Sequence, residues 1–143
     1  MATGIQRLVR RALLARLKAN AGLTALVPAA SINPDGEPTW PHIRLRAPVT
    51  RRLRAAGVNG GEGSFDVHAF ARSRYDAGAR VETAEDHAGR IGGAIEAAMA
   101  DNRLALEGGG TVRIEVGDMR LLEDDTPDAF HWFAQVNWRA LAS

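Results

Sequence analysis

The stretch from Ser64 to Met99 constrains the fold most, because its hydrophobic pattern changes period without an intervening linker. Its first part alternates apolar with other side chains, which is typical of a half-buried strand; the apolar positions are Phe65, Val67, Ala69 and Ala71. After a turn at 73–78, apolar residues recur at steps of three and four, which predicts an amphipathic helix; they are Val81, Ala84, Ala88, Ile91, Ile95, Ala98 and Met99. This combination predicts a helix packed on a sheet.

Length and composition limit the class of protein. The 143 residues are enough for one domain with its own core, and we expect a single domain over residues 1–143. No apolar run approaches the ~18 residues that cross a bilayer, so we expect no membrane association. The sequence contains no cysteine, which excludes disulfides, thiolate metal ligands and a cysteine nucleophile.

Further elements are expected before this unit. A basic amphipathic helix is predicted over 5–19, and a turn-rich loop over 31–41 precedes an alternating strand over 42–47. That strand should turn Ile43, Leu45 and Ala47 inward and His42, Arg44 and Arg46 outward. Residues 55–63 are rich in glycine and lack periodicity, so we expect a mobile loop there.

Two strands are expected after the unit, over 111–116 and 129–141, and they should form an antiparallel hairpin with an aromatic face. A bulge at Gly117-Asp118 would let the alternation restart beyond it. The fold class that follows is α+β, with a mixed, mainly antiparallel sheet of about four strands. Helices would cover one face, in the order α-β-β-α-β-β.

Charge is divided unevenly along the chain. Residues 1–54 carry ten basic and two acidic side chains, whereas residues 55–143 carry eight basic and fifteen acidic ones. Such asymmetry is compatible with a nucleic-acid patch, or with docking of one part of a subunit on the opposite part of a neighbour. The candidate interface or lumen residues are Arg44, Arg46, Arg51, Arg52, Arg54, Glu123, Asp124 and Asp125.

No motif predicts an enzyme. The four histidines lack metal-ligand spacing, and Gly60–Gly63 precedes a strand where a phosphate-binding loop needs a helix. Asp66 and His68 share one strand face and could form an acid–base pair, although an exposed Asp-x-His is more often plain surface. The arginine cluster comes without a recognition helix, a zinc finger or stacking aromatics on a basic strand. We therefore expect no catalytic residue, metal or cofactor.

The order of elements resembles that of the small tail-completion or tail-terminator proteins of long-tailed phages and gene transfer agents. The matching segments, in chain order, read ALLARLKANAGLTALV, PHIRL, FDVHAFARSRYDAG, IGGAIEAAM and HWFAQVNWRAL. The Gly-rich insertion at 55–63 departs from the compact hairpin expected there.

The resemblance implies a structural protein of the tail or neck of a phage-like particle, assembled in the bacterial cytoplasm. It implies a hexameric ring that caps the head-proximal end of the tail tube and joins it to the head-side connector. Partners would be further copies of the chain, the tube protein and the connector, with DNA only passing through the lumen. Other interpretations are a small basic nucleic-acid-binding adaptor or another head–tail connector protein, such as a stopper.

Overall fold

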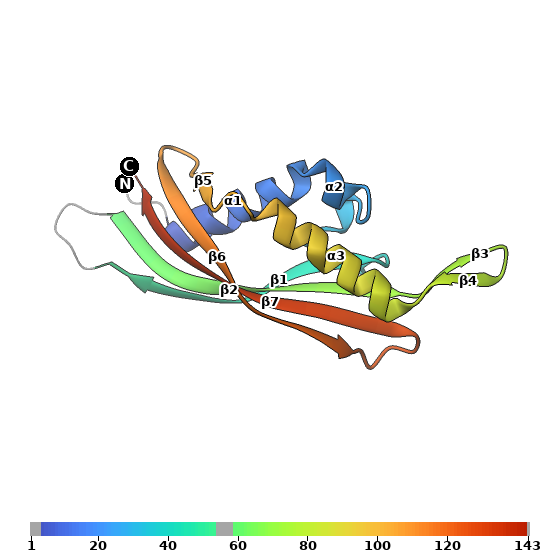
Figure 1. Ribbon diagram of the computed structural model, residues 1–143. Coiled ribbons are helices and arrows are strands. Elements are labelled where there is room, and N and C mark those ends of the chain that lie inside the picture. The colour runs from blue at the N-terminus through green and yellow to red at the C-terminus, as the bar shows by residue number, and fades with distance from the viewer. Residues whose placement is uncertain (1–3, 54–58, 143) are drawn as a thin grey trace.

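The structure is a computed structural model that describes residues 4–53 and 59–142, in which the main sheet and the helices form two layers (Figure 1). In chain order the elements are α1 (Ile5–Ala19), α2 (Ala21–Thr24), the 3-10 turn η1 (Ala29–Ser31), β1 (His42–Arg52), β2 (Asn59–Arg72), β3 (Arg74–Asp76), β4 (Ala79–Glu82), α3 (Ala84–Ala98), β5 (Arg103–Ala105), β6 (Gly110–Glu123) and β7 (Ala129–Ala142). None of the described helices is long and apolar enough to cross a membrane.

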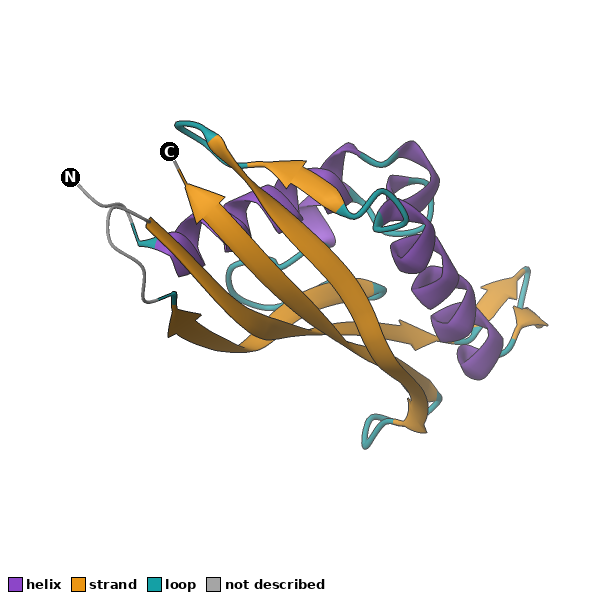
Figure 2. Cartoon of the chain, turned by 60° about the vertical axis from the view of Figure 1, so that its left-hand side comes forward, coloured by secondary structure: helices purple, strands orange, loops and turns teal. Residues whose placement is uncertain are grey.

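The main sheet has five strands in the order β1-β2-β7-β6-β5, and every neighbouring pair is antiparallel. The helices lie on one of its faces, and the other face is left open (Figures 1 and 2). The predicted α+β class with an antiparallel sheet is therefore confirmed. The expected count of about four strands is too low, because short β5 adds to the edge of β6, and β3 and β4 form a second, two-stranded sheet. The expected order α-β-β-α-β-β therefore lacks these three strands, and it also lacks the short helix α2.

The core lies between the helices and the covered face of the sheet. Phe65, Val67, Ala69 and Ala71 of β2 are fully buried, as their alternation predicts. The apolar stripes of α1 and α3 pack against them. Leu13 and Leu17 of α1 are completely buried, as are Ala88, Ile91 and Ile95 of α3. Val81 does not belong to this stripe: it lies in β4 and is 56% exposed. The helix begins later, at Ala84, and the side chain of its N-cap Thr83 accepts a hydrogen bond from the Asp86 amide.

The predicted loop over 55–63 is wrong for residues 59–63, which form the first part of β2; residues 55–58 lie outside the described residues. Glycine is needed here because neighbouring strands approach closely. A Cβ on Gly63 would overlap the Val49 carbonyl, and one on Gly60 would lie 2.7 Å from the Ala140 carbonyl oxygen. Glycine therefore indicates close backbone packing at these positions and not a loop.

β1 departs from the alternation predicted for it. Its pairing with β2 shifts register between Arg46 and Val49, and Ala47 has a φ of 48°. This bulge lets the strand continue past Pro48 to Arg52, and it leaves Ala47 exposed instead of inward. His42, expected outward, is only 4% exposed because it packs among aromatic rings. The bulge predicted in β6 is confirmed, between Val116 and Met119.

Two adjacent glycines of α3 are expected to respond oppositely to alanine. A Cβ on Gly92 would lie 2.4 Å from the buried indole of Trp132, whereas a Cβ on Gly93 would meet nothing within 4 Å. Gly93→Ala should therefore raise the free energy of unfolding by about 0.5–1 kcal/mol through helix propensity. Gly92→Ala should lower it by about 1–2 kcal/mol, because steric cost exceeds that gain. Urea denaturation measures both, and two equal increases would contradict this packing of α3.

Candidate interaction surfaces

The candidate arginines of the sequence fall into two groups in the structure. Arg44 and Arg46 lie on the open face of the sheet, opposite His68 and Asp66 of β2. Arg44 donates to the carbonyl oxygens of Pro34 and Gly36, at 3.3 Å each, and so holds the preceding loop against the strand. The Arg46 guanidinium carbon lies 5.8 Å from the centroid of the Phe70 ring. Both arginines are thus engaged within the subunit.

Arg51 and Arg52 lie at the far end of β1, away from the first pair. Arg51 is bound to Glu62 of β2, with Nη2 2.7 Å from Oε1. Arg52 is exposed and forms no ion pair with the described residues. Arg54, the fifth candidate, lies outside the described part of the chain. Among the described candidates, Arg52 is therefore the one most available to a partner.

The acidic candidates lie at the opposite end of the sheet, at the end of β6 and in the turn that leads to β7. Glu123, Asp124 and Asp125 line an open cleft of about 440 Å³, together with Asp128 and with Glu85 at the start of α3. Arg80 of β4 is a basic side chain on its wall. β2 runs from one end of the sheet to the other, and its 14 residues span roughly 45 Å. The sheet therefore carries an arginine end and a carboxylate end.

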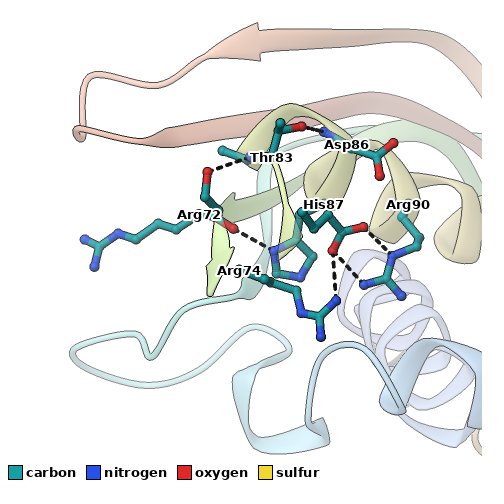
Figure 3. A network of polar contacts seen from close by, with 9 residues as sticks. Arg72, Arg74, Thr83, Asp86, His87 and Arg90 are labelled. Carbon is teal, nitrogen blue, oxygen red and sulfur yellow. Dashed lines mark hydrogen bonds and ion pairs between the residues drawn. The ribbon is translucent and has the colours of Figure 1, made fainter. Parts of the chain in front are cut away.

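The predicted turn at 73–78 is instead the β3–β4 hairpin, and a network of polar contacts fixes its base (Figure 3). Glu82 accepts two hydrogen bonds of 2.9 Å from Arg90 of α3, and Arg74 of β3 lies 3.3 Å from the same carboxylate. These two guanidinium groups, Arg90 foremost, lower the pKa of Glu82 to about 2. The carboxylate is charged at neutral pH and ties the hairpin to the helix.

A second set of bonds joins the hairpin base to the acidic turn. The Ser73 hydroxyl donates to Asp128 at 2.6 Å, and the Tyr75 hydroxyl donates to the same carboxylate at 3.0 Å. These bonds lower the pKa of Asp128, that of Ser73 contributing most. Ser73 also accepts from the Ala84 amide, while His87 donates to the Arg72 carbonyl oxygen at 2.7 Å. His87 therefore holds the end of β2 against the start of α3.

A cluster of histidine and phenylalanine rings on the open face was not foreseen. The His42 ring stacks on Phe70, which stacks on His131, with centroids 4.8 Å apart in each pair. His68 Nδ1 lies 2.9 Å from His131 Nε2, and the His68 ring also contacts Phe133. Among the described residues Asp66 and His68 form no hydrogen bond with each other, and the His68 ring is bonded to His131. Aromatics therefore do accompany arginines on this strand face, contrary to the sequence-based expectation.

The histidines of this cluster are neutral at pH 7. Burial, with Arg44 and Arg46 nearby for His42, lowers the pKa of His42 and of His68 to about 4; for His68, His131 adds to the effect of burial. Burial also lowers the pKa of His131. Within the described residues no three potential ligands converge into a metal site. The rings therefore form an uncharged patch beside the arginines.

A short repeated pattern could have revealed the cluster. The sequence His-x-Phe occurs at 68–70 in β2 and again at 131–133 in β7. In the antiparallel register His68 faces Phe133 and Phe70 faces His131, so the two copies interlock. The repeat is visible in the sequence, but its meaning depends on the pairing register of β2 with β7, which sequence periodicity alone does not give.

Comparison with known proteins identifies the family. The description "Tail completion protein gp17" belongs to a family whose profile matches residues 11–141. The chain belongs to this family. The predicted relationship to tail-completion proteins is thus confirmed, and the family's description is that of a structural tail component and not of an enzyme.

Solved structures show the same fold. One chain in a structure titled "Virion of native gene transfer agent (GTA) particle" superimposes with a TM-score of 0.72 and 17% sequence identity. The match covers 97% of this chain and 98% of that one, so it includes every layer described above. No curated protein sequence matches. The fold is therefore one found in a gene transfer agent virion.

Proposed function

We propose that the protein forms a ring, hexameric as in the tail terminators it resembles, that caps the head-proximal end of a tail tube and joins it to the head-side connector. Family membership and the fold shared with a virion component support this role. The whole chain would act as one domain in the tail or neck of a phage-like particle, after assembly in the bacterial cytoplasm. Its partners would be further copies of itself, the tube protein and the connector.

The observation that carries the ring is the placement of opposite charge at the two ends of the sheet. A closed ring uses a heterologous interface, in which each subunit presents two different and complementary surfaces. Exposed Arg52 lies at one end of the sheet, and the carboxylates of Glu123, Asp124 and Asp125 lie at the other. Head-to-tail contact between these ends would neutralise both, and complementary charges also select the partner and its orientation.

The mass of the purified protein in solution tests this proposal. Light scattering after size exclusion should give six times the subunit mass of 15.3 kDa, and negative-stain images should show rings with a central opening. A monomer or an isologous dimer at all concentrations would contradict the proposal.

The rival function, a nucleic-acid adaptor, draws support from the arginines and aromatic rings on the open face. Titration with duplex DNA at several salt concentrations decides between the two. Steep salt dependence at micromolar affinity would favour the adaptor. Rings without such binding would remove it, and the DNA would then only pass through the lumen.

A further inference from the structure

The β3–β4 hairpin projects from the carboxylate end of the molecule, beyond the start of α3 (Figures 1 and 2). Its two strands pair only with each other, in a sheet separate from the main one. Two large apolar side chains on it are uncovered, since Tyr75 is 58% and Val81 is 56% exposed. An isolated two-stranded hairpin is marginally stable in water and gains stability by packing on another surface.

The hairpin is nevertheless held in one direction. Glu82 bridges Arg74 and Arg90 at its base (Figure 3). Tyr75 is bonded to Asp128 of the β6–β7 turn. Its tip is a tight two-residue turn in which Ala77 has a φ of 50° and Gly78 one of 82°. A braced arm that carries exposed apolar side chains loses little conformational freedom when it docks, which favours binding.

We propose that this hairpin is an assembly arm that packs on the outer edge of β1, around Val49, in the neighbouring copy of the chain. The inference rests on the proposed ring and names the contact that closes it. Val81 and the aromatic ring of Tyr75 would cover Val49. The acidic cleft beside the arm would then face the arginines at the end of the same β1 strand.

The outer edge of β1 suits this partner for three reasons. β1 is an outermost strand of the main sheet, and among residues 4–53 and 59–142 its far edge pairs with nothing beyond the loop contacts at its start. Val49 on it is 59% exposed, and Arg51 and Arg52 follow, which complements the charge of the carboxylate end. Val49 pairs with Ser64, nearer the arginine end of β2 than the end that leads into the arm, so the two surfaces are distinct, as a head-to-tail contact requires. Pro48 cannot donate to a ladder, so side chains would carry the contact.

Engineered disulfides test the contact directly, because the chain contains no cysteine of its own. A chain carrying both Val81→Cys and Val49→Cys should, after mild oxidation, run as a ladder of covalent multiples on a denaturing gel. Reduction should return it to the monomer. The matched control carries Val81→Cys and Ala97→Cys, with Ala97 exposed on α3, and should give no ladder beyond dimers. Efficient crosslinking of the single variant Val81→Cys to itself would overturn the proposal, since it indicates an isologous contact.

Val81→Glu provides an independent measurement. Because Val81 is exposed, this variant should unfold at the wild-type temperature while its subunits associate at least tenfold more weakly. Ala97→Glu should leave association unchanged. The wild type could form rings while the disulfide ladder is missing and Val81→Glu associates normally. This result would overturn the proposed role of the arm but not the proposed ring. If the wild type never forms rings, the proposed function itself fails. Should Val81→Glu fold poorly, the disulfide ladder decides alone.

Discussion

Phe65→Ala is expected to lower the free energy of unfolding by about 3–5 kcal/mol, the cost typical of a fully buried phenylalanine. Phe65 lies in the middle of the covered face, is 1% exposed and stacks on Trp138 of the neighbouring strand at 6.3 Å. Removal of its ring leaves a cavity between the sheet and the helices. The hydrogen-bonded strands cannot move far enough to fill this cavity. Chemical denaturation followed by circular dichroism, at a concentration below that of assembly, measures the loss.

Phe70→Ala is the matched control, five residues further along the same strand and on the other face. Phe70 is half-buried and is covered by the rings of His42 and His131 instead of by a second layer. Its replacement should therefore cost about 1–2 kcal/mol, mainly lost ring stacking. Equal losses at both positions would contradict the assignment of covered and open faces.

The main outline of this fold could be read from periodicity. Alternation identified the part of β2 that carries Phe65, and the three-to-four-residue repeat identified most of α3. The last strand and the bulge in β6 were also predicted correctly. These features depend on which side chains face the core, and the spacing of apolar residues along the chain shows this directly.

Other features depend on contacts between distant strands, and the sequence does not show them. Gly60 and Gly63 have the composition of a loop, but they lie in a strand because β1 and β7 leave no room for a Cβ. Val81 continues the spacing of the helix, yet the bonds of Glu82 to Arg74 and Arg90 place it in a hairpin. The positive φ of Ala47 is likewise a consequence of the register shift and not of its own preference.

The sequence predicted which residue types would form the candidate interface, but not how these side chains are arranged in the structure. Arginines and carboxylates were singled out from charge asymmetry alone, which cannot distinguish an internally bound Arg44 from an exposed Arg52. The structure separates them, and it shows that Arg51 is bound to Glu62. A charge reversal at Arg51 would therefore place two carboxylates side by side within one subunit, whereas reversal at Arg52 tests the interface cleanly.

Arg52→Glu is accordingly expected to weaken assembly by at least tenfold per interface, about 1.4 kcal/mol, because a repulsive contact replaces an attractive one. Arg10→Glu, on the exposed side of α1, changes the net charge equally and should have little effect. Sedimentation velocity over a range of concentrations measures both. Since exposed charges are screened, the difference between the two variants should shrink as salt is raised from 0.05 to about 0.5 M.

The reversal at the other end provides the decisive comparison. Asp125 is exposed in the β6–β7 turn, whereas Asp124 accepts a bond from the Thr126 amide and helps to form that turn. Asp125→Arg alone should weaken the ring as Arg52→Glu does, and combining the two should restore association to within about threefold of the wild type if the ends meet. Additive weakening in the double variant would mean that these ends face different partners. In that case the arginine end would be a candidate for the lumen or for the docking face toward the tube.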